Sequence, residues 1–280
     1  MNPRACSIAL TTIAATVALS ACDSAAPTAA LRAPTDNPSF ITKGGSLDGN
    51  AHPAVVLIVM DIDGSPAFRC SGTMLSPRVV LTAGHCAGEP GEFSGMRVFT
   101  ESDVEHGNNN YPFAGPNTIE AKSWHSHPQF TEAAFFLHDV GVITLKSDFT
   151  LPASAYGHLP AENQLDALQT RASTTFTAVG YGVQRINPAQ LVEEIVRMNA
   201  QPHLIQINTH LTGSFSMLLS NNASTGGTCF GDSGGPNFLG SSSVVAGVTS
   251  FGRNDTCGGT GGVFRLDRKD VLDFVSSYLK

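Results

Sequence analysis

The sequence is poor in basic charge, in long apolar runs, in phosphate-binding motifs and in repeats. It has 16 Lys and Arg against 23 Asp and Glu, and the formal net charge of −7 argues against nucleic acid as a partner. Its N-terminal apolar run, residues 8–19, is too short to span a bilayer as a mature helix. No glycine-rich phosphate loop and no internal repeat are evident, so neither a nucleotide site nor a repeat architecture is indicated.

Turn-forming residues are abundant instead. The 280 residues include 28 Gly and 16 Pro, are 41% hydrophobic, and suffice for one large domain or two small ones that share a core. The β-rich runs at residues 55–59, 140–145 and 244–250 are short and separated by turn residues, and Asp63-Gly64 is a hairpin turn signal. This pattern predicts an all-β barrel or sandwich.

Helical periodicity is confined to two short stretches. Residues 191–198 fit either a short helix or a strand. In the last stretch Val271, Phe274, Val275 and Leu279 recur at helical spacing. This spacing predicts a short C-terminal helix, with Asp267 as its N-cap.

Residues 1–21 predict an export signal, because Arg4 precedes the apolar run. The run ends Leu19-Ser20-Ala21-Cys22, which resembles the lipobox of bacterial lipoproteins, where the cysteine is lipidated and becomes the new N-terminus. Lipidation of Cys22 would anchor the protein in the bacterial cell envelope, and this anchor is the only membrane contact expected. The alternative is an ordinary secretory signal cleaved near Ala21, with a secreted product.

The chain changes in composition after the signal. Residues 22–40 are rich in Ala, Pro, Thr and Ser and predict a disordered tether or pro-segment, and residues 41–280 form the predicted domain. Of six cysteines, two precede residue 23 and four lie in the domain. Those four form two pairs that are local in sequence, Cys70 with Cys86 and Cys229 with Cys257, which suits disulfides in an oxidising compartment.

One stretch, Gly231-Asp232-Ser233-Gly234-Gly235, places a serine between glycines. A serine hydroxyl is a poor nucleophile and needs a base to take its proton and donors to hold the oxyanion it creates. The glycines permit a tight turn, so the N–H groups of Gly231 and Ser233 can point into one hole. The motif also fits the Gly-x-Ser-x-Gly elbow of α/β-hydrolases, but that fold needs a histidine after the serine, and none follows Ser233.

Two further segments could supply the base and an orienting acid: Thr82-Ala83-Gly84-His85-Cys86 and Asp139-Val140-Gly141-Val142. Together with Gly231-Asp232-Ser233-Gly234-Gly235-Pro236 they resemble the trypsin/chymotrypsin family of serine peptidases, in the family's order of His, Asp and Ser. Weaker similarities are His127-Pro128, Gly180-Tyr181-Gly182 and Ser250-Phe251-Gly252. The resemblance covers roughly residues 41–280 and implies two six-stranded antiparallel β-barrels with the active site in the cleft between them.

The resemblance also implies the role of each residue. Ser233 would attack the scissile carbonyl to form an acyl-enzyme, His85 would transfer its proton, and Asp139 would orient His85. The N–H groups of Gly231 and Ser233 would form the oxyanion hole, and Ser250 would hydrogen-bond Asp139. The disulfides would be Cys70–Cys86 and Cys229–Cys257. The expected protein is a monomer that needs no cofactor and acts on proteins or peptides.

The resemblance places three glycines at the substrate pocket. Gly227 stands where trypsins carry an aspartate that binds Lys or Arg, and Gly252 and Gly262 match wall positions that stay small in open pockets. An uncharged, open pocket predicts large apolar or aromatic residues before the scissile bond. In the alternative, Asp255 reaches the pocket and restores a preference for basic residues.

The domain start resembles the activation site of the family. Ile41-Thr42-Lys43-Gly44 stands in place of Ile-Val-Gly-Gly, and Pro53 follows Ile41 at the family's spacing. Cleavage after Phe40 would free the ammonium group of Ile41 to pair with Asp232 and order the oxyanion loop. It would also release the domain from any anchor at Cys22.

Other interpretations compete with these. His125 and His127 have metal-ligand spacing but lack a further ligand, so a structural role is expected. Glu101, Asp103 and Glu105 could bind calcium, as a loop in this region does in some family members, but a solvated acidic loop is favoured and no metal is expected. The main rival function is a protease-like binding protein without turnover. Such proteins usually lack a triad residue, whereas all three are present here.

Overall fold

A computed structural model describes residues 45–187 and 190–280, which belong to one unit of the chain, residues 38–280. The predicted export signal, Cys22, the tether and Ile41 lie outside the described residues. None of the helices in the described part of the chain is long and apolar enough to cross a membrane.

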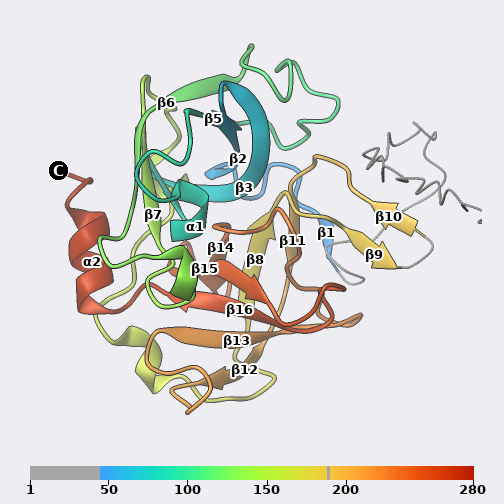
Figure 1. The fold of residues 1–280 in the computed structure, drawn as a ribbon. Helices are drawn as coiled ribbons and strands as arrows, with labels where there is room; N and C mark the ends of the chain where they lie inside the picture. The colour runs from blue at the N-terminus through green and yellow to red at the C-terminus, as the bar shows by residue number, and fades with distance from the viewer. Residues whose placement is uncertain (1–44, 188–189) are drawn as a thin grey trace, which may run out of the picture. The chain divides into compact units, whose positions relative to one another are not determined.

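Six antiparallel strands close into a barrel (Figure 1). In sheet order they are β2 (Val55–Ile62), β3 (Ser65–Ser76), β4 (Val79–Thr82), β7 (Gly141–Leu145), β6 (Thr118–Ser126) and β5 (Gly95–Phe99), and β5 pairs with β2 to close the ring. The hairpin between β2 and β3 turns at Asp63 and Gly64, which both have positive φ, as a type I′ turn requires. Residues 55–60 are buried along their whole length, which explains why β2 is a continuous apolar run without alternation.

The second half is a curled antiparallel sheet. In sheet order its strands are β1 (Ser46–Leu47), β11 (Met198–Ala200), β8 (Phe176–Gly180), β14 (Pro236–Leu239), β15 (Val245–Gly252), β16 (Gly259–Arg265), β13 (Ser216–Asn221) and β12 (Leu204–Ile207). A single bridge between Thr175 and His203 joins the regions before β8 and β12. The expected all-β fold is therefore confirmed. In the described residues this second half is a curled sheet of eight strands, whereas the expectation was a six-stranded antiparallel barrel.

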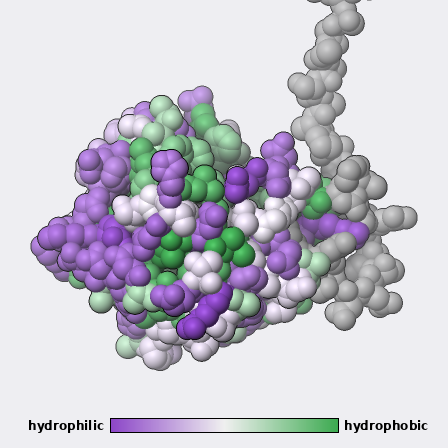
Figure 2. Space-filling model, turned by 90° about the horizontal axis from the view of Figure 1, so that it is seen from below, coloured by the Kyte–Doolittle hydropathy of each residue, from purple (hydrophilic) through white to green (hydrophobic). Residues whose placement is uncertain are grey.

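The remaining elements are short. They are a separate two-stranded ribbon of β9 (Arg185–Asn187) and β10 (Gln190–Val192), the helices α1 (Gly84–Ala87) and α2 (Lys269–Ser276), and the 3₁₀ turns η1 (Glu132–Ala134), η2 (Ala153–Ala155) and η3 (Gln164–Ala167). The ambiguous residues 191–198 are extended or irregular, not helical. On the face shown in Figure 2, hydrophobic residues form separate small areas among polar ones.

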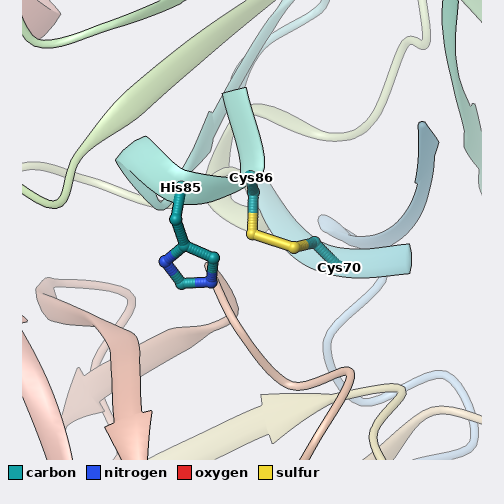
Figure 3. A group of neighbouring side chains, drawn as sticks. All are labelled: Cys70, His85 and Cys86. Atoms are coloured by element: carbon teal, nitrogen blue, oxygen red, sulfur yellow. A yellow bond between two sulfur atoms is a disulfide. The ribbon is translucent and has the colours of Figure 1, made fainter. Parts of the chain in front are cut away.

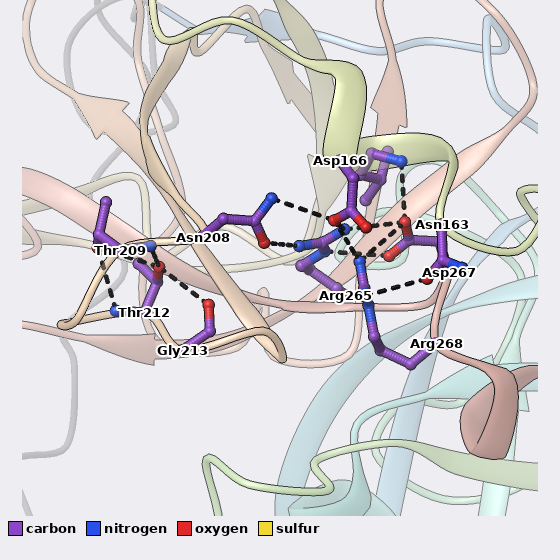
Figure 4. A network of polar contacts seen from close by, with 10 residues as sticks. Asn163, Asp166, Asn208, Thr209, Thr212, Gly213, Arg265, Asp267 and Arg268 are labelled. Carbon is purple, nitrogen blue, oxygen red and sulfur yellow. Dashed lines mark hydrogen bonds and ion pairs between the residues drawn. The ribbon is translucent and has the colours of Figure 1, made fainter.

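The C-terminal helix is present, but Asp267 is not its N-cap. Arg268 occupies that position, and the Asp267 carboxylate accepts hydrogen bonds from the Leu165 N–H at 2.8 Å and the Arg265 Nε at 3.0 Å. Arg265 is fully buried and also contacts Asp166, as Figure 4 shows. Because a buried guanidinium needs charged partners, the carboxylate of Asp267 is used there and not at the helix end.

Buried polar contacts join the two halves of the domain. Arg197 donates from Nη1 to the carbonyl of Val55 at 2.9 Å and from Nε to the Asp48 carboxylate at 2.9 Å. The Tyr181 hydroxyl donates to the carbonyl of Glu101 at 2.7 Å, and burial raises the pKa of Tyr181 to about 12. The Tyr181 hydroxyl also lies 3.3 Å from the carbonyl oxygen of Val55 on β2, so it holds the end of β8 against β2. Gly182, the next residue but one after β8, donates its backbone N–H to Asp232.

Candidate active site

His85 lies on α1, a single helical turn that follows β4. The Cys70–Cys86 disulfide joins β3 to this turn, and Figure 3 shows the disulfide beside the imidazole. Gly84 lets the turn approach Phe130, because an added Cβ there would lie 2.6 Å from a ring carbon. The two cysteines and His85 are close enough to suggest a metal site, but both sulfurs are in the disulfide and neither is available as a thiolate ligand.

Asp139 is completely buried and faces His85. Both carboxylate oxygens lie 3.0 Å from His85 Nδ1, and the His85 backbone N–H donates to Oδ1 at 2.9 Å. Ser250 on β15 donates its hydroxyl to Oδ2 at 2.5 Å. The strand pairing shifts register between Thr249 and Phe251, so Ser250 is the bulged residue and the bulge places its hydroxyl against Asp139. The expected partners of Asp139 are thus both in contact with it.

The charge around His85 favours its protonated form. Burial works to lower the pKa of His85, but the adjacent Asp139 carboxylate raises it, and Glu132 and Glu92 add to this effect, so the pKa lies above 6.5. Phe135 stands edge-on to the imidazole with ring centroids 6.0 Å apart. Neither Glu132 nor Phe135 was expected from the sequence, because the 3₁₀ turn η1 and its end, where they lie, carry no recognisable motif.

Ser233 lies in the tight loop before β14. Gly231 and Gly234 have φ of +95° and +77°, and a Cβ on Gly234 would lie 2.0 Å from Thr82 Oγ1. Ser71 on β3 holds this loop, since its backbone N–H donates to the carbonyl of Ser233 at 2.8 Å and its hydroxyl donates to that of Gly231 at 2.9 Å. Ser71 was missed because only the packing of β3 against the loop reveals it.

The predicted oxyanion donors are free for a ligand. Within residues 45–187 and 190–280, the backbone N–H groups of Gly231 and Ser233 donate to no acceptor. In the same described residues no hydrogen bond joins Ser233 Oγ to the His85 ring, although both residues line one cavity. Such a bond is often long before substrate binds.

Asp232 directly precedes Ser233 in the tight loop before β14, and its side chain is buried. Its carboxylate accepts the Gly182 N–H at 2.8 Å and the Cys229 N–H at 2.9 Å. Gly180 and Gly182 make room for it, because an added Cβ would lie 2.2 Å and 2.3 Å from its oxygens. Burial raises the pKa of Asp232 to about 6, although the two N–H bonds and the charge of Arg69 oppose this. Its predicted partner, Ile41, lies outside the described residues.

A cavity of about 350 Å³ lies between the halves of the domain. It is lined by His85, Glu132, Phe135, Thr228, Cys229, Phe230, Ser233, Thr249, Ser250, Phe251, Gly252, Asn254 and Cys257. The Cys229–Cys257 disulfide therefore joins two parts of the cavity wall. Among the acidic residues of the described chain, only Glu132 lines this cavity, and Asp255 does not reach it.

The three predicted pocket glycines have different surroundings. Gly252 lines the cavity, whereas Gly227 and Gly262 do not. A Cβ on Gly227 would lie 2.2 Å from Cγ of buried Asn221, and one on Gly262 would lie 2.4 Å from the Phe251 ring. Those two glycines therefore make room for neighbouring side chains of the protein itself.

The other candidate sites are occupied by internal contacts. His127 is buried, stacks on His138 with ring centroids 4.9 Å apart, and accepts the Gln129 N–H at 3.2 Å. His125 stacks on Tyr278. Both histidines thus pack around the C-terminal helix.

The acidic loop has its own internal partners. The Glu101 carboxylate accepts bonds from the Asn108 N–H at 3.0 Å, Asn109 Nδ2 at 2.6 Å and Asn117 Nδ2 at 3.0 Å. Asp103 accepts the His106 N–H at 3.0 Å, and Glu105 Oε2 accepts the Ile195 N–H at 3.3 Å. The carboxylate oxygens that could bind a cation therefore receive N–H donors, from the loop itself for Glu101 and Asp103 and from Ile195 for Glu105.

Comparison with known proteins places this geometry in a family. Residues 41–269 match the family described as Trypsin. Brachyurin of Leptuca pugilator is 28% identical over 195 residues, covering 68% of this chain and 78% of the relative. Trypsin 5G1 of Aedes aegypti is 31% identical over 209 residues (72% and 71%), and chymotrypsin of Phaedon cochleariae is 27% identical over 254 residues (88% and 82%).

Solved structures share the fold. A collagenase structure at 1.7 Å resolution has a TM-score of 0.66 at 18% identity and covers 86% of this chain and 98% of its own. A mutant of human heparin-binding protein has a TM-score of 0.64 at 20% identity and covers 85% and 96%. At these identities the structures show the fold alone, but the family match spans most of the sequence. This chain therefore belongs to the trypsin family of serine endopeptidases.

Proposed function

We propose that His85, Asp139 and Ser233 form a catalytic triad that hydrolyses peptide bonds through an acyl-enzyme. The observation that carries this proposal is the contact of His85 Nδ1 with both Asp139 oxygens at 3.0 Å, while His85 and Ser233 line one cavity. A carboxylate only accepts hydrogen bonds, so it holds the proton on Nδ1 and leaves Nε2 with its lone pair. That tautomer makes His85 a base.

The reaction then follows in two stages. Ser233 Oγ attacks the scissile carbonyl while its proton passes to His85 Nε2, and the carbonyl oxygen takes the negative charge. The free N–H groups of Gly231 and Ser233 hold this oxyanion. His85 next gives the proton to the leaving amine, the C–N bond breaks, and an ester to Ser233 remains. Water repeats the sequence on the ester and releases the acid.

The cavity supports an apolar residue before the scissile bond. Among the described residues, no charged side chain lines its wall between β15 and the loop that carries Ser233, and Glu132, the one acid of these residues that lines the cavity, stands on the His85 side with Phe135. An uncharged pocket gives a Lys or Arg side chain no partner for its charge, and burying an unpaired charge is costly. We therefore expect apolar residues to be preferred over basic ones.

Activation of the enzyme and its location in the cell would depend on residues outside the described part of the chain. Asp232 is buried without a cation among its hydrogen-bond partners in the described residues, and the ammonium of Ile41, once freed by cleavage after Phe40, would supply one. The two disulfides fit an exported protein. A lipid anchor at Cys22 would hold the precursor at a membrane, and the domain would act as a monomer.

The test is hydrolysis of peptide nitroanilides that differ only in the residue before the scissile bond. We expect Ser233→Ala and His85→Ala each to lower kcat by about a million-fold. Ser242→Ala, a serine in an exposed turn, serves as the matched control and should retain full activity. Hydrolysis by Ser233→Ala at the wild-type rate would refute the triad, and a strong preference for Arg would refute the apolar pocket.

A further inference from the structure

Phe251, near the end of β15, forms part of the cavity wall. It directly follows the bulge that turns Ser250 toward Asp139, and it pairs with Gly262 across β15 and β16. Side chains of directly paired residues lie on the same face of a sheet. The Phe251 ring accordingly stands over Gly262, where an added Cβ would lie 2.4 Å from ring carbons Cε2 and Cζ and 2.5 Å from Cε1.

The ring limits the cavity on the side of β16. Phe251 lines the cavity together with Ser233, whereas Gly262 beneath the ring does not line it. The Thr228 side chain lies close to Gly261 in a similar way but less tightly, because a Cβ added to Gly261 would lie 3.1 Å from the Thr228 hydroxyl oxygen. The space over β16 that the glycines would leave open is thus filled by the protein's own side chains.

We propose that Phe251 sets the depth of the substrate pocket and selects short aliphatic residues, such as Ala and Val, over aromatic residues before the scissile bond. This inference rests on the proposed function of the site. It keeps the apolar character expected from the sequence and replaces the expected large size. We expected large substrate side chains because Gly262 would leave the pocket wall open, but the Phe251 ring covers Gly262.

The physical basis is exclusion by a well-packed ring. A longer substrate side chain reaches the Phe251 ring and must displace it from Gly262 to go deeper. In apolar pockets a difference of one methylene group already changes kcat/KM by about 10–200-fold. A ring that blocks the pocket should therefore dominate the choice between Ala and Phe substrates.

The experiment compares four nitroanilides, with Ala, Val, Phe or Arg before the scissile bond, on the full chain and on a form that starts at Ile41. For wild type we expect kcat/KM to be at least about tenfold higher for Ala than for Phe. Phe251→Ala should shift the Phe-to-Ala ratio by at least about tenfold toward Phe, and Phe251→Leu should shift it less. Phe113→Ala removes an equal ring that is 56% exposed and lies outside the cavity, so it should leave the ratio unchanged.

Labelling of Ser233 by a fluorophosphonate distinguishes a failure of the inference about Phe251 from a failure of the proposed triad. If Ser233 labels in the wild type and the Phe251 variants, and the ratio does not change, the inference about Phe251 is overturned while the triad stands. A wild type that prefers Phe to Ala also overturns it. If Ser233 is not labelled in any folded variant, the proposed function itself fails. Should Phe251→Ala not fold, as judged by thermal unfolding, Phe251→Leu decides.

Discussion

The two buried aspartates of the site have very different surroundings. Asp139 is held by the His85 ring, the His85 backbone N–H and the Ser250 hydroxyl, so side chains from both halves of the domain contact it. Asp232 is equally buried but accepts only two backbone N–H groups among the described residues, and burial raises its pKa to about 6. Under the proposed roles, the base His85 therefore has its acidic partner within the described residues, whereas Asp232, beside the proposed oxyanion donors, has no cation among its hydrogen-bond partners there.

This difference has a structural cause. His85 and Asp139 are attached to strands of the closed barrel, and a disulfide fixes the turn that carries His85. Ser233 and Asp232 lie in a loop with glycines at positive φ, held through Ser71 and the Gly180–Gly182 turn. Breaking the base side should affect only the chemistry, while changes on the oxyanion side should affect loop order as well.

Among the changes that compare the surroundings of the two aspartates, Asp139→Asn should produce the largest effect. Asn presents an N–H group to His85 and favours the wrong tautomer, so kcat should fall by about ten-thousand-fold while the fold persists. The measurement is kcat/KM beside a thermal unfolding curve. Asp148→Asn, on an exposed carboxylate, is the control. A loss below tenfold would show that Asp139 does not orient the base.

Gly182→Ala should be next in size. The added Cβ would lie 2.3 Å from an Asp232 oxygen, which displaces the carboxylate and disorders the donors of the oxyanion hole. Losing such donors lowers kcat by about 100–1,000-fold. The control is Gly258→Ala, where the nearest atom to an added Cβ is 3.7 Å away. Full activity in Gly182→Ala would mean that the loop tolerates movement of Asp232.

The pH dependence of stability should reveal Asp232 directly. Its pKa is raised from 3.8 to about 6 in the folded chain, so between these values the folded state holds a proton that the unfolded state has lost. Stability of the uncleaved chain should therefore fall as pH rises through this window, by about 3 kcal/mol at most.

Urea unfolding at a series of pH values measures this dependence, with Asp232→Asn as the variant that flattens it. In the form that starts at Ile41, pairing with the ammonium would lower the pKa and reverse the slope. Equal slopes in the uncleaved and cleaved forms would contradict a new charge partner for Asp232.

Glu132→Gln should produce the smallest effect. The negative charge of Glu132 contributes to the raised pKa of His85, and only neutral His85 can act as a base. The variant should therefore move the acid limb of the kcat/KM profile to lower pH. Glu162→Gln, on an exposed carboxylate that does not line the cavity, should leave the limb in place. An unmoved limb in Glu132→Gln would show that solvent screens this charge.

Local motifs were sufficient to predict the parts of the site that lie within a few consecutive residues. The tight turn at Gly231 follows from consecutive residues, and the two disulfides follow from cysteine pairs that are local in sequence. The contact of His85 with Asp139, which lie 54 residues apart, was expected only from the resemblance to the trypsin/chymotrypsin family. The strand signals at residues 55–59 and the Asp63-Gly64 turn likewise appear as expected. In these places the local sequence determines the local structure.

The features that were missed depend on register and on loop packing. Ser71 contacts the nucleophile loop only because β3 passes beside it, and Phe251 covers Gly262 only because a bulge shifts the pairing of β15 with β16. Asp267 is of a residue type that is favoured as an N-cap, but its carboxylate instead accepts a hydrogen bond from the buried Arg265 guanidinium. A single sequence does not reveal which strand lies opposite a given residue, so these contacts required the structure.

The most direct test is fluorophosphonate labelling followed by peptide mapping, applied to the full chain and to the form that starts at Ile41, with Ser233→Ala as control. We expect label on Ser233, and stronger label in the Ile41 form, because the freed ammonium of Ile41 would pair with Asp232 and order the oxyanion donors. Absence of label from both folded forms would contradict it and favour a binding protein without turnover.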